Sequence, residues 1–366
     1  MHLICSKTRL TDAISMVQKA ISTRSTLPIL EGILIDAEDE LTLTGYDMET
    51  GIECKIDTDI REKGSIVVNA KIFGDIIRKL PEELVIIKSS EDLSISILCG
   101  KSSFKIRGLE ALDYPKIPLV EEAQKVAVPQ KTLVSMINQS IFATSTDEAR
   151  PVLNGLKVST ENDNLEVVAI DGFRLAVRQE EWDGKNAALS FIVPSKAMAE
   201  VSRILGDTED PVAIYPSHNH ILFETKNIKL VSRLIQGEFM DYKKIIPPGC
   251  KSKITLQSRD MLDAIERASL VINVEQRRFP VTFNNPSQNE LMISAKTDLG
   301  HVEEIIPIQM EGENIDIDFN PKYFLDVMKC LEDQEIVLEF SGPSAPCLVK
   351  PAEGEAFLYL ILPLRR

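Results

Sequence analysis

Residues 192–198 read IVPSKAM, and the same pattern recurs at residues 67–73 as VVNAKIF and at residues 318–324 as DFNPKYF. In each copy the end of an apolar strand is followed by a short break and then by a lysine that opens an amphipathic helix. The lysines of successive copies, at positions 71, 196 and 322, lie 125 and 126 positions apart. Self-similarity at a fixed long period indicates tandem copies of one structural unit.

A second landmark supports the repeat and helps to place the domain boundaries. Residues 113–118 read DYPKIP, and residues 241–247 read DYKKIIP 128 positions later. A chain of 366 residues fits two or three domains, and the repeat decides for three. Stretches rich in proline and charge at 108–124 and 235–252 are typical of linkers. The domains are therefore expected at residues 1–120, 121–247 and 248–366.

Each third of the chain shows the order β-α-β-β-β twice. In the first third, apolar residues at three- and four-residue spacing predict helices over residues 8–21 and 71–80. The corresponding helices of the other two thirds are expected at residues 131–142, 196–205, 259–270 and 321–331. In each half one helix must cover one face of an antiparallel sheet, because neither element can bury its apolar side alone. The pattern predicts an α+β fold in which each domain is a pair of β-α-β-β-β units with two helices side by side.

The composition excludes several classes of protein. With 44% apolar and 27% charged residues, the chain has the balance of a globular protein. No stretch approaches the roughly 18 uninterrupted apolar residues of a membrane span, and no signal peptide is evident. The six cysteines are scattered, which fits reduced thiols better than a disulfide framework or a zinc site. We therefore expect a cytoplasmic location.

The net charge is −15, from 41 basic and 56 acidic residues. Taken alone, this charge argues against a nucleic-acid partner, because neutralising phosphates requires lysine and arginine. A local basic stripe can nevertheless coexist with an acidic exterior. The net charge therefore leaves DNA binding open.

Five further segments point to a known family. They read RSTLPIL at residues 24–30, LNG at 153–155, AIDGFRLA at 169–176, FMDY at 239–242 and YLILPLR at 359–365. Together with the repeat and the length, they make the whole chain resemble the bacterial DNA polymerase III β subunits, the β sliding clamps. The resemblance implies three tandem clamp domains with helices inside and antiparallel sheets outside, and two protomers that close head-to-tail into a ring. It also implies a processivity factor that encircles duplex DNA and tethers the replicative polymerase and other replication and repair proteins.

The expected helices all carry lysine or arginine. A solvated helix face explains such a pattern without any partner. The resemblance favours weak contacts to DNA phosphates that position the duplex without reading its sequence. The candidate DNA-binding residues are Arg24, Lys71, Arg78, Lys79, Lys196 and Arg203.

The resemblance also implies a pocket between the second and third domains for a short peptide of the polymerase, the clamp loader or repair proteins. An apolar cleft with a few polar anchors suits an extended peptide. The alternatives are an ordinary hairpin turn at Asp171-Gly172 and a terminal edge strand at residues 360–364. The expected lining is Leu153, Ile170, Gly172, Phe173, Arg174, Leu175, Met240, Lys244, Ile245, Leu360, Ile361, Leu362, Pro363, Leu364 and Arg365.

Four positions in and beside this pocket depart from the usual family wording. Phe173 stands where histidine is frequent, Met240 stands where proline is frequent, and Pro151-Val152 replaces an aromatic pair. These changes keep the pocket apolar and leave its peptide preference open.

The resemblance places a seam between protomers at Phe104 and Ile106 of one chain and at Leu270 and Val271 of the other. Closing a two-fold ring removes unpaired strand edges, which would otherwise favour aggregation. Ordinary core packing is the alternative explanation for these four apolar residues.

Nothing in the sequence indicates catalysis, a cofactor or a metal. His218 and His220 alternate along a strand without a further cysteine or histidine nearby, and no Walker loop or GxGxxG motif occurs. We therefore expect a protein that is not an enzyme. A ring-shaped interaction hub without a tight DNA role is the main alternative. A repeat-fold enzyme is the other, and a pocket holding two acids with perturbed pKa would favour it.

Overall fold

The computed structural model describes residues 1–22, 27–120, 125–161, 163–182, 189–272, 279–298 and 300–365. By contacts the chain forms two compact units. The first consists of Met1–Lys131 and Arg203–Leu234, and the second of Thr132–Ser202 and Ile235–Arg366.

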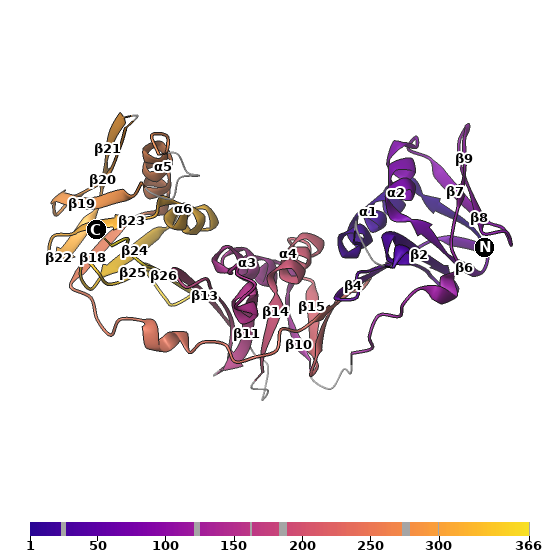
Figure 1. Ribbon diagram of the computed structural model, residues 1–366, viewed down its shortest axis with the longest axis horizontal. Helices are drawn as coiled ribbons and strands as arrows, with labels where there is room; N and C mark the ends of the chain where they lie inside the picture. Colours follow the sequence, from indigo (N-terminus) through magenta and orange to yellow (C-terminus); the bar gives the residue numbers. More distant parts are fainter. Residues whose placement is uncertain are drawn as a thin grey trace. The chain divides into compact units, whose positions relative to one another are not determined.

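All six expected helices are present, each starting within one residue of its expected first position (Figure 1). They are α1 (Lys7–Val17), α2 (Ala70–Lys79), α3 (Gln130–Asn138), α4 (Ser195–Ile204), α5 (Ser258–Ser269) and α6 (Pro321–Cys330). The break before the lysine in the repeated stretch is a helix cap in two copies. The Asn69 side chain accepts a hydrogen bond from the Ile72 N–H, and the Asn320 side chain accepts one from the Lys322 N–H, both at 3.0 Å.

Two of the helices end earlier than the periodicity predicts. Helix α1 passes at Val17 into the 3-10 turn η1 (Gln18–Ala20). Helix α3 ends at Asn138, before the 3-10 turn η4 (Ile141–Ala143). The Ser140 hydroxyl donates to the Met136 carbonyl at 2.7 Å and so competes with continuation of the helix.

The first unit contains two antiparallel sheets. Its strands are β1 (His2–Ser6), β2 (Gly32–Ala37), β3 (Leu41–Tyr46), β4 (Thr50–Ile56), β5 (Asp59–Glu62), β6 (Gly64–Asn69), β7 (Leu84–Ser89), β8 (Ser94–Cys99), β9 (Ser102–Arg107), β10 (Val126–Pro129), β15 (Pro211–Pro216), β16 (His220–Glu224) and β17 (Ile228–Arg233). One sheet has the order β5-β1-β7-β8-β9, and the other has the order β10-β15-β16-β17-β4-β3-β2-β6. The eight-stranded sheet therefore runs from the first third of the chain into the middle third through the β4–β17 pair.

The second unit repeats this arrangement. Its strands are β11 (Gly155–Glu161), β12 (Asn164–Ile170), β13 (Arg174–Glu181), β14 (Ser190–Pro194), β18 (Ser252–Gln257), β19 (Val281–Ser287), β20 (Glu290–Thr297), β21 (Gly300–Pro307), β22 (Gln309–Gly312), β23 (Asp316–Phe319), β24 (Glu335–Phe340), β25 (Cys347–Pro351) and β26 (Phe357–Ile361). The sheets have the orders β14-β11-β12-β13-β26-β25-β24-β18-β22 and β21-β20-β19-β23. The β13–β26 pair joins the middle third to the last third.

The six β-α-β-β-β half-units expected from the sequence all occur in order along the chain. Two short strands were not expected, β5 and β22. Each is an edge strand beside the first strand of its domain, β5 on β1 and β22 on β18. They are only four residues long and lack a strong apolar pattern, so no local sequence pattern predicts them.

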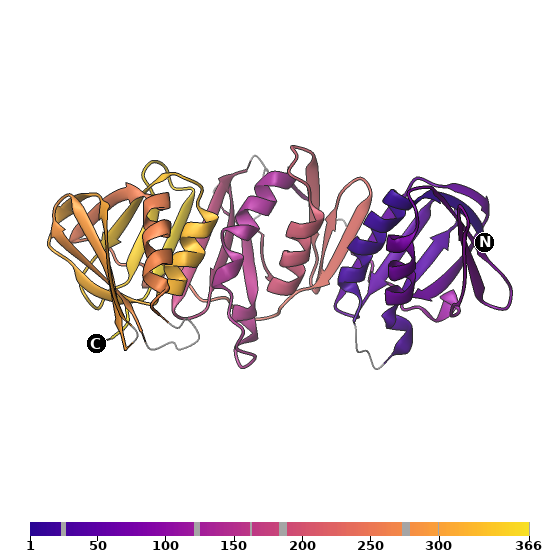
Figure 2. The same cartoon turned by 90° about the horizontal axis from the view of Figure 1, so that it is seen from above.

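The helices lie in pairs over the sheets. Figure 2 shows α1 beside α2 and α5 beside α6, and Ser202 of α4 donates to Asn138 of α3 at 2.7 Å. Helix α2 buries Ala70, Phe73, Gly74 and Ile77, the 3.6-residue stripe that the sequence predicts. In the last third, Phe324 of α6 packs edge-on against Phe283 and Phe319, with ring centres 4.8 and 5.0 Å apart. Each helix therefore holds its sheet through an apolar stripe and leaves its polar face outside.

Candidate functional site

The candidate partner site is built on the strand pair β13–β26. Antiparallel pairing places Leu175 opposite Leu360 and Val177 opposite Leu358. Because side chains alternate along a strand, these four residues share one face of the sheet. Leu153, Val168, Ile170, Tyr242 and Leu348 pack with them as one cluster of buried residues.

The second linker covers part of this cluster. Phe239 and Ile246 pack against it, and the buried Tyr242 lies in the 3-10 turn η6 (Tyr242–Ile245). The Tyr242 hydroxyl donates to Glu166 Oε2 at 2.6 Å and fixes the turn on the sheet. Met240 and Ile245 on the same linker expose 48% and 39% of their surface.

The structure thus brings together five of the fifteen residues expected in the peptide pocket. Leu153, Ile170, Leu175, Leu360 and Leu362 belong to the cluster or pack against it. Exposed Lys244, on the same turn as Ile245, forms an ion pair with Asp241 at 3.2 Å. The result is an apolar surface with exposed apolar side chains and a cation on the adjoining linker.

The turn between β12 and β13 borders this surface. Asp171 Oδ1 accepts hydrogen bonds from the N–H groups of Phe173 and Arg174, at 2.8 and 3.0 Å. Gly172 has φ +94°, a backbone conformation that glycine adopts without steric cost. The Leu362 N–H donates to the Phe173 carbonyl at 2.9 Å, which ties the segment after β26 to the turn.

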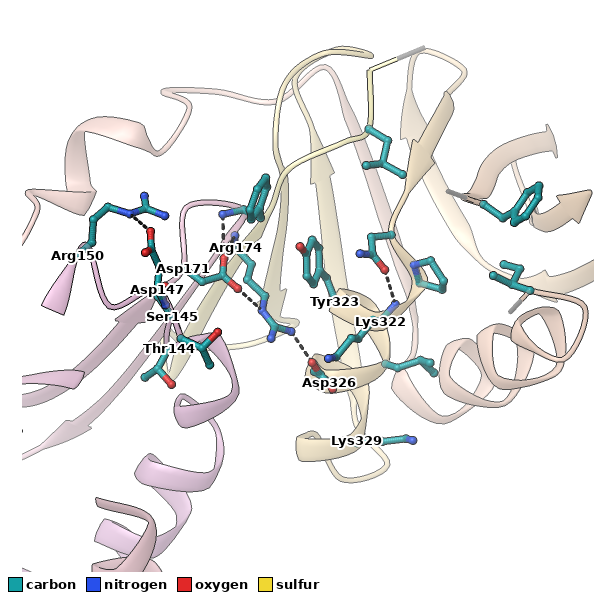
Figure 3. Close-up of a pocket in the computed structure, with 18 residues that line it drawn as sticks. Thr144, Ser145, Asp147, Arg150, Asp171, Arg174, Lys322, Tyr323, Asp326 and Lys329 are labelled. Carbon is teal, nitrogen blue, oxygen red and sulfur yellow. Dashed lines mark hydrogen bonds and ion pairs between the residues drawn. The ribbon is translucent and has the colours of Figure 1, made fainter. Parts of the chain in front are cut away.

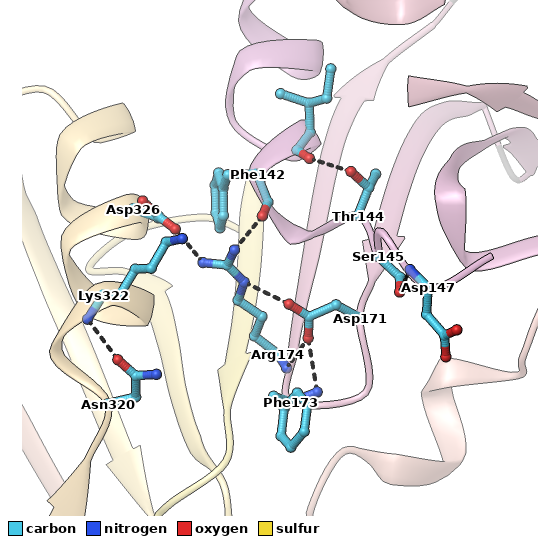
Figure 4. Close-up of polar contacts among 11 residues, drawn as sticks. Phe142, Thr144, Ser145, Asp147, Asp171, Phe173, Arg174, Asn320, Lys322 and Asp326 are labelled. Carbon is cyan, nitrogen blue, oxygen red and sulfur yellow. Dashed lines mark hydrogen bonds and ion pairs between the residues drawn. The ribbon is translucent and has the colours of Figure 1, made fainter. Parts of the chain in front are cut away.

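Arg174 faces the other side of the sheet. Its side chain is only 8% exposed and forms ion pairs with Asp171 at 3.0 Å and with Asp326 of α6 at 2.5 Å. It also donates to the Phe142 carbonyl, and its guanidinium carbon lies 4.8 Å from the ring centre of Tyr323. Figure 4 shows the contacts of Arg174 with Asp171, Asp326 and the Phe142 carbonyl, which come from three segments.

The fifteen expected lining residues therefore divide between two faces. Ile361 is opposite Arg174 in the register, so its side chain lies on the Arg174 face of the sheet and not in the apolar cluster. The alternation of side chains along a strand is enough to predict this division between the two faces from the sequence. With Leu175 toward the apolar cluster, Arg174 must point to the opposite face.

A pocket of about 900 Å³ with mixed polar and apolar lining lies on the Arg174 side (Figure 3). Its lining comes from the 144–150 loop, the 171–174 turn and the start of α6, and it includes Phe173 and Leu364. Phe173 is 58% exposed and stacks on Tyr323 with ring centres 6.3 Å apart. The backbone N–H of Ala149 and the Arg150 guanidinium hold the pKa of Asp147 below its ordinary value.

Sequence reasoning missed three residues that contact Arg174, of which Tyr323 and Asp326 also line this pocket. Tyr323 and Asp326 contact Arg174 from α6, and Phe142 contacts it from η4. The sequence could have pointed to Tyr323, because it directly follows Lys322 of the repeated stretch. It could not have pointed to Asp326, because an acidic residue on a helix is ordinarily a surface residue.

Five of the six candidate DNA-binding residues are exposed on helices. Lys71, Arg78 and Lys79 lie on α2, and Lys196 and Arg203 lie on α4. Asp75 pairs with Arg78 at 2.6 Å, so acids interleave with the bases on α2. Arg24 lies outside the described residues.

The residues expected at the protomer seam lie at or beside two sheet edges. Phe104 is 40% exposed and Ile106 is partly exposed on the edge strand β9. Leu270, which directly follows α5, is 84% exposed. The neighbouring Val271 accepts a hydrogen bond from Thr297 of β20 at 3.0 Å. Helix α5 packs on the edge strand β21, so Leu270 lies at the end of an element that borders that edge.

Within the described part of the chain, no group of three or more histidine, cysteine, aspartate or glutamate side chains could hold a metal ion. Among the same residues, no helix combines the length and apolar character needed to cross a bilayer.

Three tandem domains, sheets that continue across domain junctions, and an apolar cluster with exposed apolar linker residues at one junction define a clamp-type repeat protein. Family models confirm this class over nearly the whole chain. The N-terminal, central and C-terminal domains of the DNA polymerase III beta subunit match residues 1–118, 127–241 and 243–365. The chain belongs to the DNA polymerase III beta subunit family, the beta sliding clamps.

Individual relatives agree. The beta sliding clamp of Bacillus subtilis (strain 168) is 35% identical over 376 aligned residues and covers 100% of both chains. The crystal structure of the DNA polymerase sliding clamp from Bacillus subtilis superposes with a TM-score of 0.96 at 36% identity, covering 100% of this chain and 99% of that one. A sliding clamp from Pseudomonas aeruginosa, solved bound to griselimycin, gives a TM-score of 0.94 at 27% identity with full coverage of both chains. The family consists of processivity factors, so this chain is not an enzyme.

Proposed function

We propose that this protein is a ring-shaped processivity clamp that encircles duplex DNA and tethers the replicative polymerase through the apolar surface at the β13–β26 junction. The observation that carries this proposal is the surface itself, where Leu175 and Leu360 face the linker residues Tyr242 and Ile246. An apolar strand-lined surface with exposed Met240 and Ile245 nearby suits an extended peptide with apolar anchors. Tethering raises the local concentration of polymerase, so a weak peptide contact suffices.

Two chains close the ring head-to-tail. Strand β9 of one chain would pair with β21 of the other, which joins a five-stranded sheet to a four-stranded sheet. Phe104 and Ile106 would then pack against Leu270 and Val271. This pairing removes two exposed strand edges at each seam.

The helices supply the DNA contacts. Lys71, Arg78 and Lys79 on α2, Lys196 and Arg203 on α4, and Arg24 would approach phosphates without reading bases. Residues 1–120, 121–247 and 248–366 would form the three domains, and the protein would act in the cytoplasm on the nucleoid. Clamp loader and repair proteins would compete with polymerase for the same surface.

A topological experiment tests the ring. Clamps loaded on nicked circular DNA should fall off when the circle is cut, because a ring slides off an end. The triple variant Lys71→Glu, Arg78→Glu, Lys79→Glu should load at least tenfold less well. Lys226→Glu, a charge reversal in the β16–β17 turn, should load normally. Retention on linear DNA would refute the ring, and normal loading of the triple variant would refute the DNA role of α2.

A peptide experiment tests the partner surface. Ile245→Glu should weaken binding of a peptide from the clamp-binding segment of the polymerase, because it places a charge beside the apolar surface. Leu119→Glu alters a fully exposed leucine on the other linker and is the matched control. Equal affinity for the wild type and Ile245→Glu would locate the peptide elsewhere.

A further inference from the structure

The first domain junction has the same backbone frame as the partner surface at the second. At the first junction, β4 pairs with β17 and places Gly51 opposite Val231. At the second, β13 pairs with β26 and places Leu175 opposite Leu360. At the end of β17, the Arg233 N–H donates to the Glu49 carbonyl at 2.9 Å. At the second junction, the Leu362 N–H donates to the Phe173 carbonyl, also at 2.9 Å.

The turns beside the two strand pairs are also alike. Asp47 Oδ1 accepts hydrogen bonds from the N–H groups of Glu49 and Thr50, at 3.0 and 2.7 Å. Asp171 does the same for the two residues that follow Gly172. Met48 has φ +74° where Gly172 has φ +94°. The first junction therefore carries the same kind of turn that borders the partner surface.

The 3-10 turns and linker tyrosines that pack beside the two strand pairs are also alike. Leu30 lies in the 3-10 turn η2 (Pro28–Glu31), and Leu153 lies in η5 (Pro151–Asn154). Tyr114 of the first linker is buried with Leu30 and Tyr46, as Tyr242 of the second is buried with Leu153 and Ile170. The two junctions are copies of one site.

One feature separates the two copies. We call the strand residue over which the linker passes the floor residue. At the first junction this residue is Gly51 of β4, and the side chain of Ile117 from the linker lies over it. A Cβ added to Gly51 would stand 2.5 Å from Ile117 Cδ1. Ile117 also packs with Tyr215, Leu222 and Val231, together with Val120.

The counterpart of Ile117 behaves differently. Ile117 follows Tyr114 by three residues, and Ile245 follows Tyr242 by three residues. Ile245 is 39% exposed and stays outside its apolar cluster, whereas the next residue, Ile246, packs against that cluster. At the second junction the strand position equivalent to Gly51 is Leu175, and the linker leaves Ile245 exposed beside the cluster.

We infer that the first junction is a second copy of the partner-peptide site, filled by the chain's own Ile117 and Val120, and that it takes an extended apolar peptide when this plug is removed. The inference rests on the proposed function of the second junction. If so, the fold contains two similar peptide sites per chain, and the first linker limits each chain to one bound partner peptide by filling one of them. An apolar occupant fits because Tyr215, Leu222 and Val231 are already covered by apolar side chains.

The test counts peptides per chain. A fluorescent peptide from the clamp-binding segment of the polymerase should bind the wild type at one per chain by titration calorimetry. Ile117→Ala with Val120→Ala should bind two. Leu119→Ala, in the same linker but fully exposed, should bind one.

A blocked background isolates the new site. Met240→Glu with Ile245→Glu should abolish binding, and adding Ile117→Ala with Val120→Ala should restore one peptide per chain. Gly51→Leu gives an independent variant, because the new side chain would displace Ile117 and supply the floor that Leu175 provides elsewhere. It should also raise the count to two. Thermal unfolding and molecular mass confirm that each variant is folded.

The outcomes separate the two claims. One peptide per chain in both folded plug variants would overturn the inference and leave the proposed function standing. Undiminished binding to the Met240→Glu, Ile245→Glu variant would overturn the assignment of the second junction and, with it, this inference. A wild type that binds two peptides would also overturn it, because the plug would then exclude nothing.

Discussion

Gly172 has the left-handed backbone conformation that joins β12 to β13 beside the partner surface. At φ +94°, a side chain strains the backbone, although only Arg150 Nη1 at 3.4 Å would meet the new Cβ. Gly172→Ala should therefore lower the free energy of unfolding by about 1 kcal/mol in urea titration. The variant should still fold, because Met48 occupies the equivalent turn with a side chain.

Gly249→Ala is the matched control for this substitution. Gly249 has no neighbour within 4 Å of an added Cβ and no left-handed φ. Its unfolding free energy should stay the same or rise slightly. Equal losses for both variants would show that backbone conformation at residue 172 is not the cause.

Tyr114 makes stability depend on alkaline pH. Burial raises the pKa of its hydroxyl, which lies 3.3 Å from the Gly32 carbonyl and 3.5 Å from the Thr44 carbonyl. A raised pKa stabilises the fold fully below the unfolded value of about 10, and this stabilisation is lost as pH rises above it. Tyr114→Phe should cost about 1 kcal/mol at pH 7. Its difference from the wild type should shrink between pH 10 and pH 11 in urea titrations, and a constant difference would contradict this account.

At the scale of single elements, the cap of α2 offers a clean test. The Asn69 side chain accepts the Ile72 N–H, one of the donors that a helix leaves without a partner in its own backbone. Asn69→Ala should lower the melting temperature through a loss of about 1 kcal/mol. Asn69→Asp keeps the acceptor at the positive helix end and should match the wild type. A loss in both variants would point to a cause other than the cap.

The helices could be predicted from sequence because their signal is local. The 3.6-residue stripe of α2 and its capping break stand within 67–79, so position and buried face both follow. The merging of sheets across junctions could not be predicted in the same way. The partners of β4 and β13 lie in β17 and β26, more than 170 positions along the chain, and no local pattern names them.

The candidate site also has features that could be predicted from the sequence and features that could not. The resemblance assembled Leu153, Leu175 and Leu360 correctly as one cluster. It did not show that Arg174 turns away to join Asp326 on α6, because that depends on which face each strand residue takes. The plugging of the first junction was equally hidden, because Ile117 and Ile245 stand in nearly identical sequence contexts. What separates the two junctions is the equivalent strand residue, a glycine at 51 that leaves room for Ile117 and a leucine at 175.

At the scale of the whole molecule, the sheets leave two edges that suit a second copy of the chain. Strand β9 ends the five-stranded sheet with Phe104 40% exposed, and β21 ends the four-stranded sheet with Ile305 57% exposed. Long apolar edges favour pairing with another chain. If β9 meets β21 of a partner, a two-fold ring contains two such seams, and every substitution acts twice.

Phe104→Asp should therefore shift the protein from dimer to monomer. Removing a buried phenylalanine from each of two seams costs about 3–6 kcal/mol in total, which raises the dimer dissociation constant roughly 10²–10⁴-fold. Sedimentation equilibrium over a range of concentrations measures this shift. Leu84→Asp is the matched control, because Leu84 is 62% exposed on β7, an interior strand of the same sheet. If Phe104→Asp dissociates no more readily than Leu84→Asp, β9 does not form the seam. A monomeric Phe104→Asp that still binds the polymerase peptide but no longer stays on circular DNA would show that ring closure, and not the partner surface, provides the hold on DNA.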